Sequence, residues 1–152
     1  MKKIIIGCGL VLLCAIIVFV AFMIWLHSAV SDHLSKKEIF SLVHENHSII
    51  LEDIKKNNFD CTYQLNGIKD ISVLENCVDF SCGGSGFGPS TSYYGFYYSG
   101  NNAVDAMRDR EYPKNAQLVP DGDGYCYREP GGDNRYYVEK IRDCFYYYES
   151  HY

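Results

Sequence analysis

The fold expected for this chain is decided by one segment, Cys77-Val-Asp-Phe-Ser-Cys-Gly-Gly-Ser-Gly-Phe-Gly-Pro-Ser-Thr-Ser-Tyr-Tyr-Gly-Phe-Tyr-Tyr-Ser99. Two strand-like runs flank a connection rich in glycine and proline, residues that supply positive or fixed φ angles. The segment therefore predicts a β-hairpin with a wide glycine-rich loop. Alternation along the first run places Phe80 and Cys82 on a packed face and leaves Asp79 on a solvated one.

The second run of the hairpin carries aromatic rings on both faces. Alternation places three of them together, namely Tyr94, Phe96 and Tyr98. If these three rings fill a core beneath a helix, Tyr93 and Tyr97 project outward on either side of Gly95 and form the candidate binding surface. Gly95 leaves a gap that a neighbouring ring or a ligand can fill. Cross-strand aromatic packing with the C-terminal strand is the favoured use of Tyr93 and Tyr97, and the binding surface is the alternative.

The charge of the chain is concentrated after its N-terminal segment. All nineteen acidic residues lie beyond position 31, together with twelve of the fourteen Lys and Arg, so residues 31–152 carry a formal charge of −7. Such a charge disfavours binding to nucleic acid or to anionic lipid surfaces. The fourteen tyrosines are typical of β-rich surfaces and of recognition surfaces alike.

The N-terminal segment contains 23 consecutive residues without charge, from Ile4 to Leu26. As a helix it is ~35 Å long, enough to cross a ~30 Å hydrocarbon layer. Lys2 and Lys3 precede the run, and Trp25 lies where an interfacial aromatic anchor is expected. The pattern predicts a single-pass protein of the cell membrane with a cytoplasmic stub (1–3), a transmembrane anchor (4–26), a linker (27–34) and an extracytoplasmic domain (35–152).

Cleavage of the N-terminal segment as a secretory signal is the alternative. Ala29-Val-Ser31 has small residues at a suitable spacing, so the domain would be secreted after cleavage near Ser31. The uncharged run is longer than the ~7 to 15 apolar residues of such signals, and this favours the uncleaved anchor.

The rest of the chain predicts one helix followed by strands. Ser35-Lys-Lys-Glu38 is a capping-box pattern, and apolar residues at helical spacing follow it, which predicts a helix over Lys36–Asn57. Gly100–Lys114 is polar and is expected to be a surface excursion. Besides the hairpin, the expected strands are Cys61–Leu65, Ile68–Leu74, Ala116–Val119, Gly124–Arg128 and Tyr136–Tyr148, the last with a break at Arg142-Asp143. This order predicts an α+β fold, in which an N-terminal transmembrane helix precedes an amphipathic helix packed on an antiparallel β-sheet.

Five cysteines lie outside the uncharged run, namely Cys61, Cys77, Cys82, Cys126 and Cys144. An extracytoplasmic location permits disulfides, and an odd number leaves at least one thiol unpaired. Cys77 and Cys82 are poor partners on one strand, because ~16 Å would separate Cα atoms that a disulfide holds within ~7 Å. The expected pair is Cys126 with Cys144, and Cys61 is the alternative partner of Cys126.

No residue pattern specifies a reaction. Cys82 precedes two glycines, as an exposed nucleophile would, but alternation assigns it to the packed row. His44 and His47 lack a third ligand at helical spacing, and Asp121 and Asp123 lack the glutamate that ends a calcium loop. The glycine-rich loop lacks the helix and the lysine of phosphate-binding loops. We therefore predict no catalytic residue, no metal ligand and no cofactor.

The hairpin sequence Gly83-Gly-Ser-Gly-Phe-Gly-Pro-Ser-Thr-Ser-Tyr-Tyr-Gly-Phe-Tyr-Tyr-Ser99, with Phe145-Tyr-Tyr-Tyr-Glu149, resembles small bacterial membrane-anchored or exported proteins of unassigned function. The resemblance covers mainly the hairpin and the C-terminal strand. It implies a location in or outside the membrane and transfers no catalytic residue.

Three functions are compatible with these features. The favoured hypothesis is a membrane-anchored binding or protein-interaction module that contacts a protein or another envelope component. A pilin-like structural subunit, which self-associates, is the second, because pilins also place an apolar helix before an amphipathic helix and a sheet. This chain lacks the glutamate that pilins carry early in the apolar segment. An extracytoplasmic hydrolase or thiol enzyme is the least favoured, since no acid–base or metal constellation is evident.

Overall fold

A computed structural model of the chain describes residues 14–23, 31–87 and 90–152. The chain divides into two units, Met1–Asp32 and His33–Tyr152.

In the first unit, residues 14–23 form a helix with exposed side chains. None of the helices in the described ranges is both long and apolar enough to cross a membrane. Lys2, Lys3 and Trp25 lie outside these ranges, as does most of the predicted anchor.

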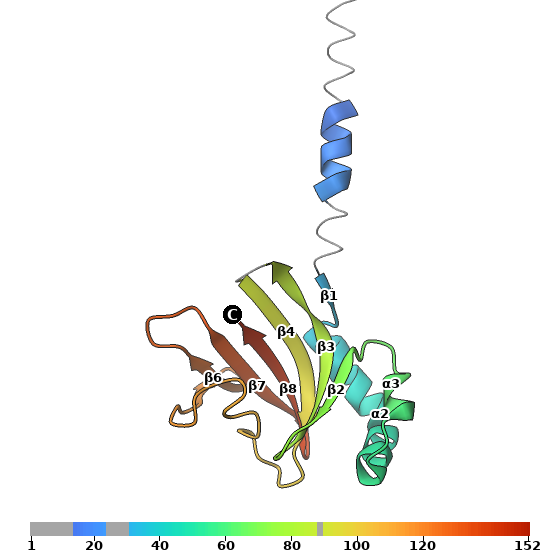
Figure 1. The fold of residues 1–152 in the computed structure, drawn as a ribbon, viewed down its shortest axis with the longest axis vertical. Helices are drawn as coiled ribbons and strands as arrows, with labels where there is room; N and C mark the ends of the chain where they lie inside the picture. The colour runs from blue at the N-terminus through green and yellow to red at the C-terminus, as the bar shows by residue number, and fades with distance from the viewer. Residues whose placement is uncertain (1–13, 24–30, 88–89) are drawn as a thin grey trace, which may run out of the picture. The chain divides into compact units, whose positions relative to one another are not determined.

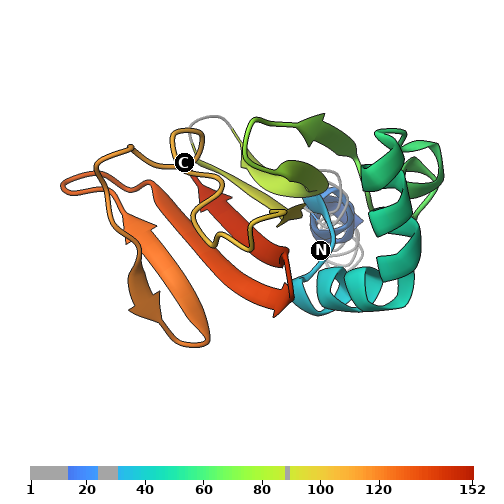
Figure 2. The ribbon, with the colours of Figure 1, turned by 90° about the horizontal axis from the view of Figure 1, so that it is seen from below.

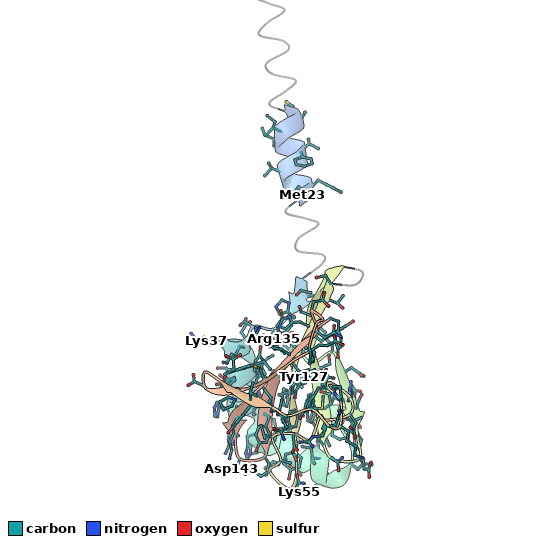
Figure 3. The ribbon with its side chains drawn as sticks, turned by 90° about the vertical axis from the view of Figure 1, so that its left-hand side faces the viewer. Met23, Lys37, Lys55, Tyr127, Arg135 and Asp143 are labelled. Atoms are coloured by element: carbon teal, nitrogen blue, oxygen red, sulfur yellow. The ribbon has the colours of Figure 1, made fainter. Side chains whose placement is uncertain are left out.

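Helix α2 (Lys36–Lys56) matches its prediction closely (Figure 1). The capping box forms at Ser35, whose backbone N–H donates to Glu38 Oε2 at 2.8 Å. Asn57 ends the helix in the left-handed conformation, with φ of 49°. Lys37 and Lys55, near the two ends of α2, are exposed (Figure 3). The buried face of α2 carries Ile39, Val43 and Ile50, which pack on the sheet.

The segment after α2 is helical rather than extended, so the prediction of a strand over Cys61–Leu65 is wrong. Residues Asp60–Tyr63 form the short helix α3. The buried carboxylate of Asp53 accepts hydrogen bonds at 2.8 Å from both the backbone N–H and the hydroxyl of Thr62. These bonds dock a helical turn against the end of α2, and a tertiary contact of this kind overrides a short strand-like pattern.

The remaining strands form an antiparallel sheet. Within the described residues it has eight strands, in the order β1-β3-β4-β8-β7-β6-β5, and β2 also pairs with β3. Their bounds are β1 Ser31–His33, β2 Asp70–Val73, β3 Val78–Phe87, β4 Ser90–Tyr98, β5 Val119–Asp121, β6 Gly124–Arg128, β7 Arg135–Arg142 and β8 Phe145–His151. The predicted α+β architecture, with a helix on an antiparallel sheet, is therefore confirmed for the second unit.

The central hairpin of β3 and β4 forms as predicted, but Gly83, Gly84 and Gly86 are residues of strand β3. Pairing between β3 and β4 continues to Phe87 and Ser90, with an irregularity between Ser81 and Gly84. Gly83 adopts a φ of 100° there, a conformation that glycine adopts at low cost. The prediction of a wide loop beginning at Gly83 is therefore wrong.

The gap at Gly95 is filled by a neighbouring ring. A Cβ atom on Gly95 would lie 2.5 Å from the carbonyl oxygen of Phe80 and 2.7 Å from the hydroxyl oxygen of Tyr148. Glycine at this position thus allows β8 to place Tyr148 across β4.

The two faces of the sheet are covered differently. Helix α2 covers one face, where the core includes Phe80, Cys82 and Phe96. The other face is covered by residues 99–118, which we call the cover segment, and Figure 2 shows it and α2 on different sides of the strands. Met107 and Tyr112 of the cover segment are buried, so the prediction of a surface excursion over Gly100–Lys114 is wrong.

Candidate functional site

The structure separates the two predicted binding residues. Tyr93 is 47% exposed, as expected, whereas Tyr97 is fully buried. The cover segment packs on Tyr97, whose hydroxyl donates to the carbonyl of Val104 at 2.5 Å and whose ring stacks on Tyr146. The prediction that Tyr97 projects to solvent is therefore wrong, because an irregular segment occupies that face of the sheet.

A pocket of about 330 Å³ opens beside Tyr93 on the face of the sheet that carries the cover segment. It is lined by residues from β2, β3, β4, the cover segment and the C-terminal end of the chain, namely Asp70, Ser81, Tyr93, Arg110, Glu111, Tyr148 and Tyr152. Carboxylates, hydroxyls, aromatic rings and one guanidinium therefore converge in a single concave site, which is typical of ligand pockets.

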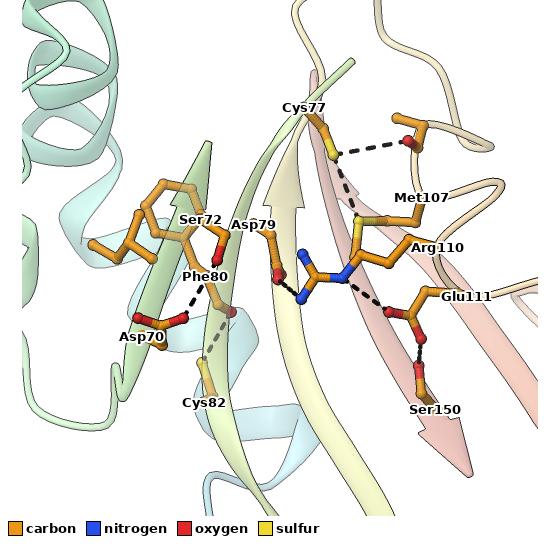
Figure 4. Close-up of polar contacts among 12 residues, drawn as sticks. Asp70, Ser72, Cys77, Asp79, Phe80, Cys82, Met107, Arg110, Glu111 and Ser150 are labelled. Atoms are coloured by element: carbon orange, nitrogen blue, oxygen red, sulfur yellow. Dashed lines mark hydrogen bonds and ion pairs between the residues drawn. The ribbon is translucent and has the colours of Figure 1, made fainter. Parts of the chain in front are cut away.

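A network of ion pairs and hydrogen bonds ties the cover segment to the sheet at this pocket (Figure 4). Arg110 reaches Asp79 on β3, with Nη2 3.1 Å from Oδ2, and its Nε lies 3.4 Å from Glu111 Oε1. The other oxygen of Glu111 accepts hydrogen bonds from the hydroxyl of Ser150 and, at 2.8 Å, from that of Tyr152. The network fixes the position of Arg110 and Glu111 even though both belong to an irregular segment.

Asp79 is the more deeply buried of the two carboxylates that contact Arg110. Its side chain is 2% exposed, and its Oδ1 makes no hydrogen bond to the described residues. Burial raises the pKa of Asp79 from 3.8 to about 6, and the neighbouring Arg110 opposes that shift. Asp79 therefore changes charge near neutral pH, and the prediction that it lies on a solvated face is wrong.

Two exposed tyrosines form the rim of the pocket. The rings of Tyr93 and Tyr152 meet edge to face with their centroids 6.0 Å apart. Backbone hydrogen bonds in both directions between Thr91 and Tyr152 hold the C-terminal residue beside β4. Burial and the hydrogen bond to Glu111 raise the pKa of Tyr152 to about 12, so its hydroxyl remains a donor at neutral pH.

The cysteines do not form the expected disulfide. Cys126 and Cys144 are both free thiols, as are Cys61, Cys77 and Cys82. Cys126 lies opposite Tyr137 in the sheet, and Cys144 lies in the turn after β7. Seven residues of extended chain separate Tyr137 from Cys144, about 23 Å at ~3.3 Å per residue, whereas a disulfide needs ~7 Å.

Most of the other residues with potential chemistry are buried or make structural contacts. Cys82 is fully buried, and burial raises the pKa of its thiol to about 12, which disfavours the thiolate. His44 is exposed, while the ring of His47 packs edge-on against Phe145, and burial lowers the pKa of His47. Asp121 forms an ion pair with Arg135 at 2.9 Å. Across the described ranges, no group of three or more His, Cys, Asp or Glu residues could hold a metal ion.

The sequence predicted one residue of the pocket, Tyr93, and missed the others. Asp79 and Ser81 alternate with buried residues on β3, which is the pattern of a polar face but does not reveal what covers that face. Arg110 and Glu111 carried no signal, because charged residues in a polar stretch are also typical of solvated loops.

No protein-family model, curated protein or solved structure matches this chain. The functional argument therefore starts from the geometry of the pocket.

Proposed function

We propose that the chain is a membrane-anchored binding module whose extracytoplasmic domain holds a partner at the pocket beside Tyr93. The observation that carries this proposal is the pocket itself, where residues far apart in the sequence converge and two exposed rings form the rim. A protein surface that combines exposed tyrosines with positioned polar groups is suited to recognition, because Tyr offers a large ring and a polar tip.

Binding is favoured over catalysis by the way the polar groups are occupied. The guanidinium of Arg110 contacts both Asp79 and Glu111, and Glu111 also accepts two hydroxyl hydrogen bonds. Groups in such a network are held rigidly, which lowers the entropic cost of binding. The seven lining residues include no cysteine and no histidine.

The membrane anchor is supported by the sequence pattern of residues 4–26. The 23 uncharged residues are long enough to span a bilayer, and the Lys2-Lys3 pair favours a cytoplasmic N-terminus. Alkaline phosphatase fused after Tyr152 should be active in cells, because this reporter folds only outside the cytoplasm. An inactive fusion would contradict the orientation, and release of the fusion into the medium would favour secretion after cleavage near Ser31.

Crosslinking in intact membranes, followed by capture of the full-length protein, tests the binding site. We expect Tyr93→Ser to lower the yield of a stoichiometric partner at least tenfold, because it removes one ring of the rim. Tyr125→Ser is the matched control, since Tyr125 on β6 is 43% exposed and does not line the pocket. Equal capture by both variants would exclude the pocket, and crosslinks solely between copies of the chain would favour the pilin-like subunit instead.

A further inference from the structure

The pocket beside Tyr93 is electronegative. Asp70 and Glu111 line it, and the carboxylate of Asp79 contacts the Arg110 guanidinium that forms part of its wall. Three carboxylates against one guanidinium leave a formal charge of −2 when all four groups are ionised. The domain around the pocket is acidic as well. A cationic ligand is therefore attracted to this site, and an anionic one is repelled.

Arg110 does not reverse this preference. Its Nη2 and Nε both face carboxylates, at 3.1 Å from Asp79 and 3.4 Å from Glu111. An anion would have to compete with these two carboxylates for the same guanidinium. The arginine thus neutralises part of the negative charge and orients Glu111, and it does not present a free anion clamp.

The pocket also contains a carboxylate, that of Asp70, with few hydrogen-bond partners of its own. Asp70 accepts one long bond of 3.3 Å from Ser72 and is otherwise exposed to the pocket. A ligand that carries several N–H donors and no acceptor complements this arrangement.

The rim adds a second attraction for a cation. Tyr93 and Tyr152 are exposed rings in edge-to-face contact. A ring face attracts an ammonium group that lies within ~6 Å of its centroid. The volume of about 330 Å³ suits a short alkyl chain.

We propose that the pocket binds a primary ammonium group on a short alkyl chain, with Asp70 as its main carboxylate partner and the Tyr93 and Tyr152 rings along the chain. This inference rests on the proposed function and specifies the chemistry of the same site. A free alkylamine and the lysine side chain of a partner protein share this chemistry.

Calorimetric titration of the full-length protein in a non-ionic polyoxyethylene detergent tests the inference. The probes are 1,5-diaminopentane and the uncharged 1,5-pentanediol, which have the same chain length. We expect the diamine to bind at least tenfold more tightly than the diol. Added salt should lower the affinity of the diamine and leave that of the diol unchanged. Equal affinities of the two probes, or no binding of the diamine, would overturn the inference.

A matched pair of variants separates a specific site from general charge attraction. Asp70→Asn should weaken diamine binding about tenfold, because it removes a carboxylate within the pocket. Asp123→Asn removes the same charge from the exposed turn between β5 and β6, and it should change the affinity less than twofold. Similar effects of the two variants would show that the diamine binds through net charge alone, which contradicts the inference.

A third probe, Nα-acetyl-lysine methylamide, distinguishes the two sources of the ammonium group. At least tenfold tighter binding than the diamine would assign the pocket to a lysine side chain, and weaker binding would assign it to a free amine. If no amine binds but Tyr93→Ser still abolishes capture of the partner, the proposed function stands and the ammonium chemistry is wrong.

Discussion

Both faces of the sheet are shielded from water, but the residues that form the two cores differ in kind. Beneath α2 the core is apolar, with Phe80 and Phe96 stacked at 4.6 Å under Ile39 and Val43. Beneath the cover segment the core is mostly tyrosine, and it contains the carboxylate of Asp79. A helix satisfies its own backbone polar groups, whereas an irregular segment needs partners for them.

The tyrosines supply those partners. Tyr97 donates its hydroxyl hydrogen to the carbonyl of Val104, and Tyr146 donates to the carbonyl of Asn102 at 2.8 Å. The ring of each tyrosine fills the core while its hydroxyl bonds to the backbone of the cover segment. This dual use accounts for Tyr97 and Tyr146, and it makes the second face more polar than the first.

The largest expected effect is at the centre of the apolar face. Phe80→Ala removes a fully buried ring that stacks on Phe96, so we expect a loss of about 3 to 5 kcal/mol in the free energy of unfolding. Chemical denaturation measures this loss. Val73→Ala, at an exposed position of the neighbouring strand β2, should cost less than about 1 kcal/mol. Similar losses for the two variants would mean that this face is not a close-packed core.

The second effect is a dependence of stability on pH, caused by Asp79 on the face beneath the cover segment. The pKa of Asp79 is about 6 in the folded chain and near 3.8 when the chain is unfolded. Between these two values the folded state keeps a proton that the unfolded state releases, so stability falls as pH rises from about 4 through about 6. The loss attributable to Asp79 is on the order of 3 kcal/mol.

Asp79→Asn removes this titration and leaves the other groups that titrate in the same range unchanged. We therefore expect the difference in unfolding free energy between wild type and variant to change across pH 4 to 7 and to be constant above it, as measured by denaturation at each pH. A difference that does not vary with pH would show that the carboxyl is ionised in the folded state throughout, held so by Arg110.

The third effect compares two buried tyrosines on the same face. Tyr97→Phe leaves the carbonyl of Val104 without its hydroxyl donor, so we expect a loss of about 1 to 2 kcal/mol. No hydrogen bond joins the hydroxyl of Tyr136, also buried, to the described backbone of the cover segment, so Tyr136→Phe should cost less than Tyr97→Phe, by about 1 kcal/mol. Thermal unfolding of both variants measures the contrast, and equal losses would refute the proposed role of tyrosine hydroxyls in holding the cover segment.

The apolar face was predictable from the sequence, because helices and strands place apolar residues at a regular spacing. The helical spacing of apolar residues after Ser35 located α2, and strand alternation placed Phe80 and Phe96 beneath it. The prediction failed at Cys61–Leu65, where hydrogen bonds from Thr62 to the Asp53 carboxylate stabilise α3 in place of a strand.

The pocket was hardly predictable, because it depends on a segment without periodicity. Alternation placed Tyr93 and Tyr97 on one face correctly, but it could not show that residues 99–118 fold back over Tyr97 and leave Tyr93 exposed. Arg110 and Glu111 reach the sheet through contacts with residues about 30 to 40 positions away, such as Asp79 and Ser150. Contacts at that separation leave no trace in local spacing.

The smallest expected effect tests whether α2 and the cover segment open independently of each other. Ser35→Ala removes the hydroxyl of the capping box at the start of α2, and such caps contribute about 1 kcal/mol. The exchange of amide hydrogens in the first turn of α2 should therefore accelerate about fivefold if that turn opens locally. Amide exchange in the cover segment, for example at Asn102 and Arg108, should be unchanged, because no bond to this segment is lost. Equal acceleration in both layers would mean that α2 and the cover segment open together, in which case the two faces share one cooperative unit despite their different chemistry.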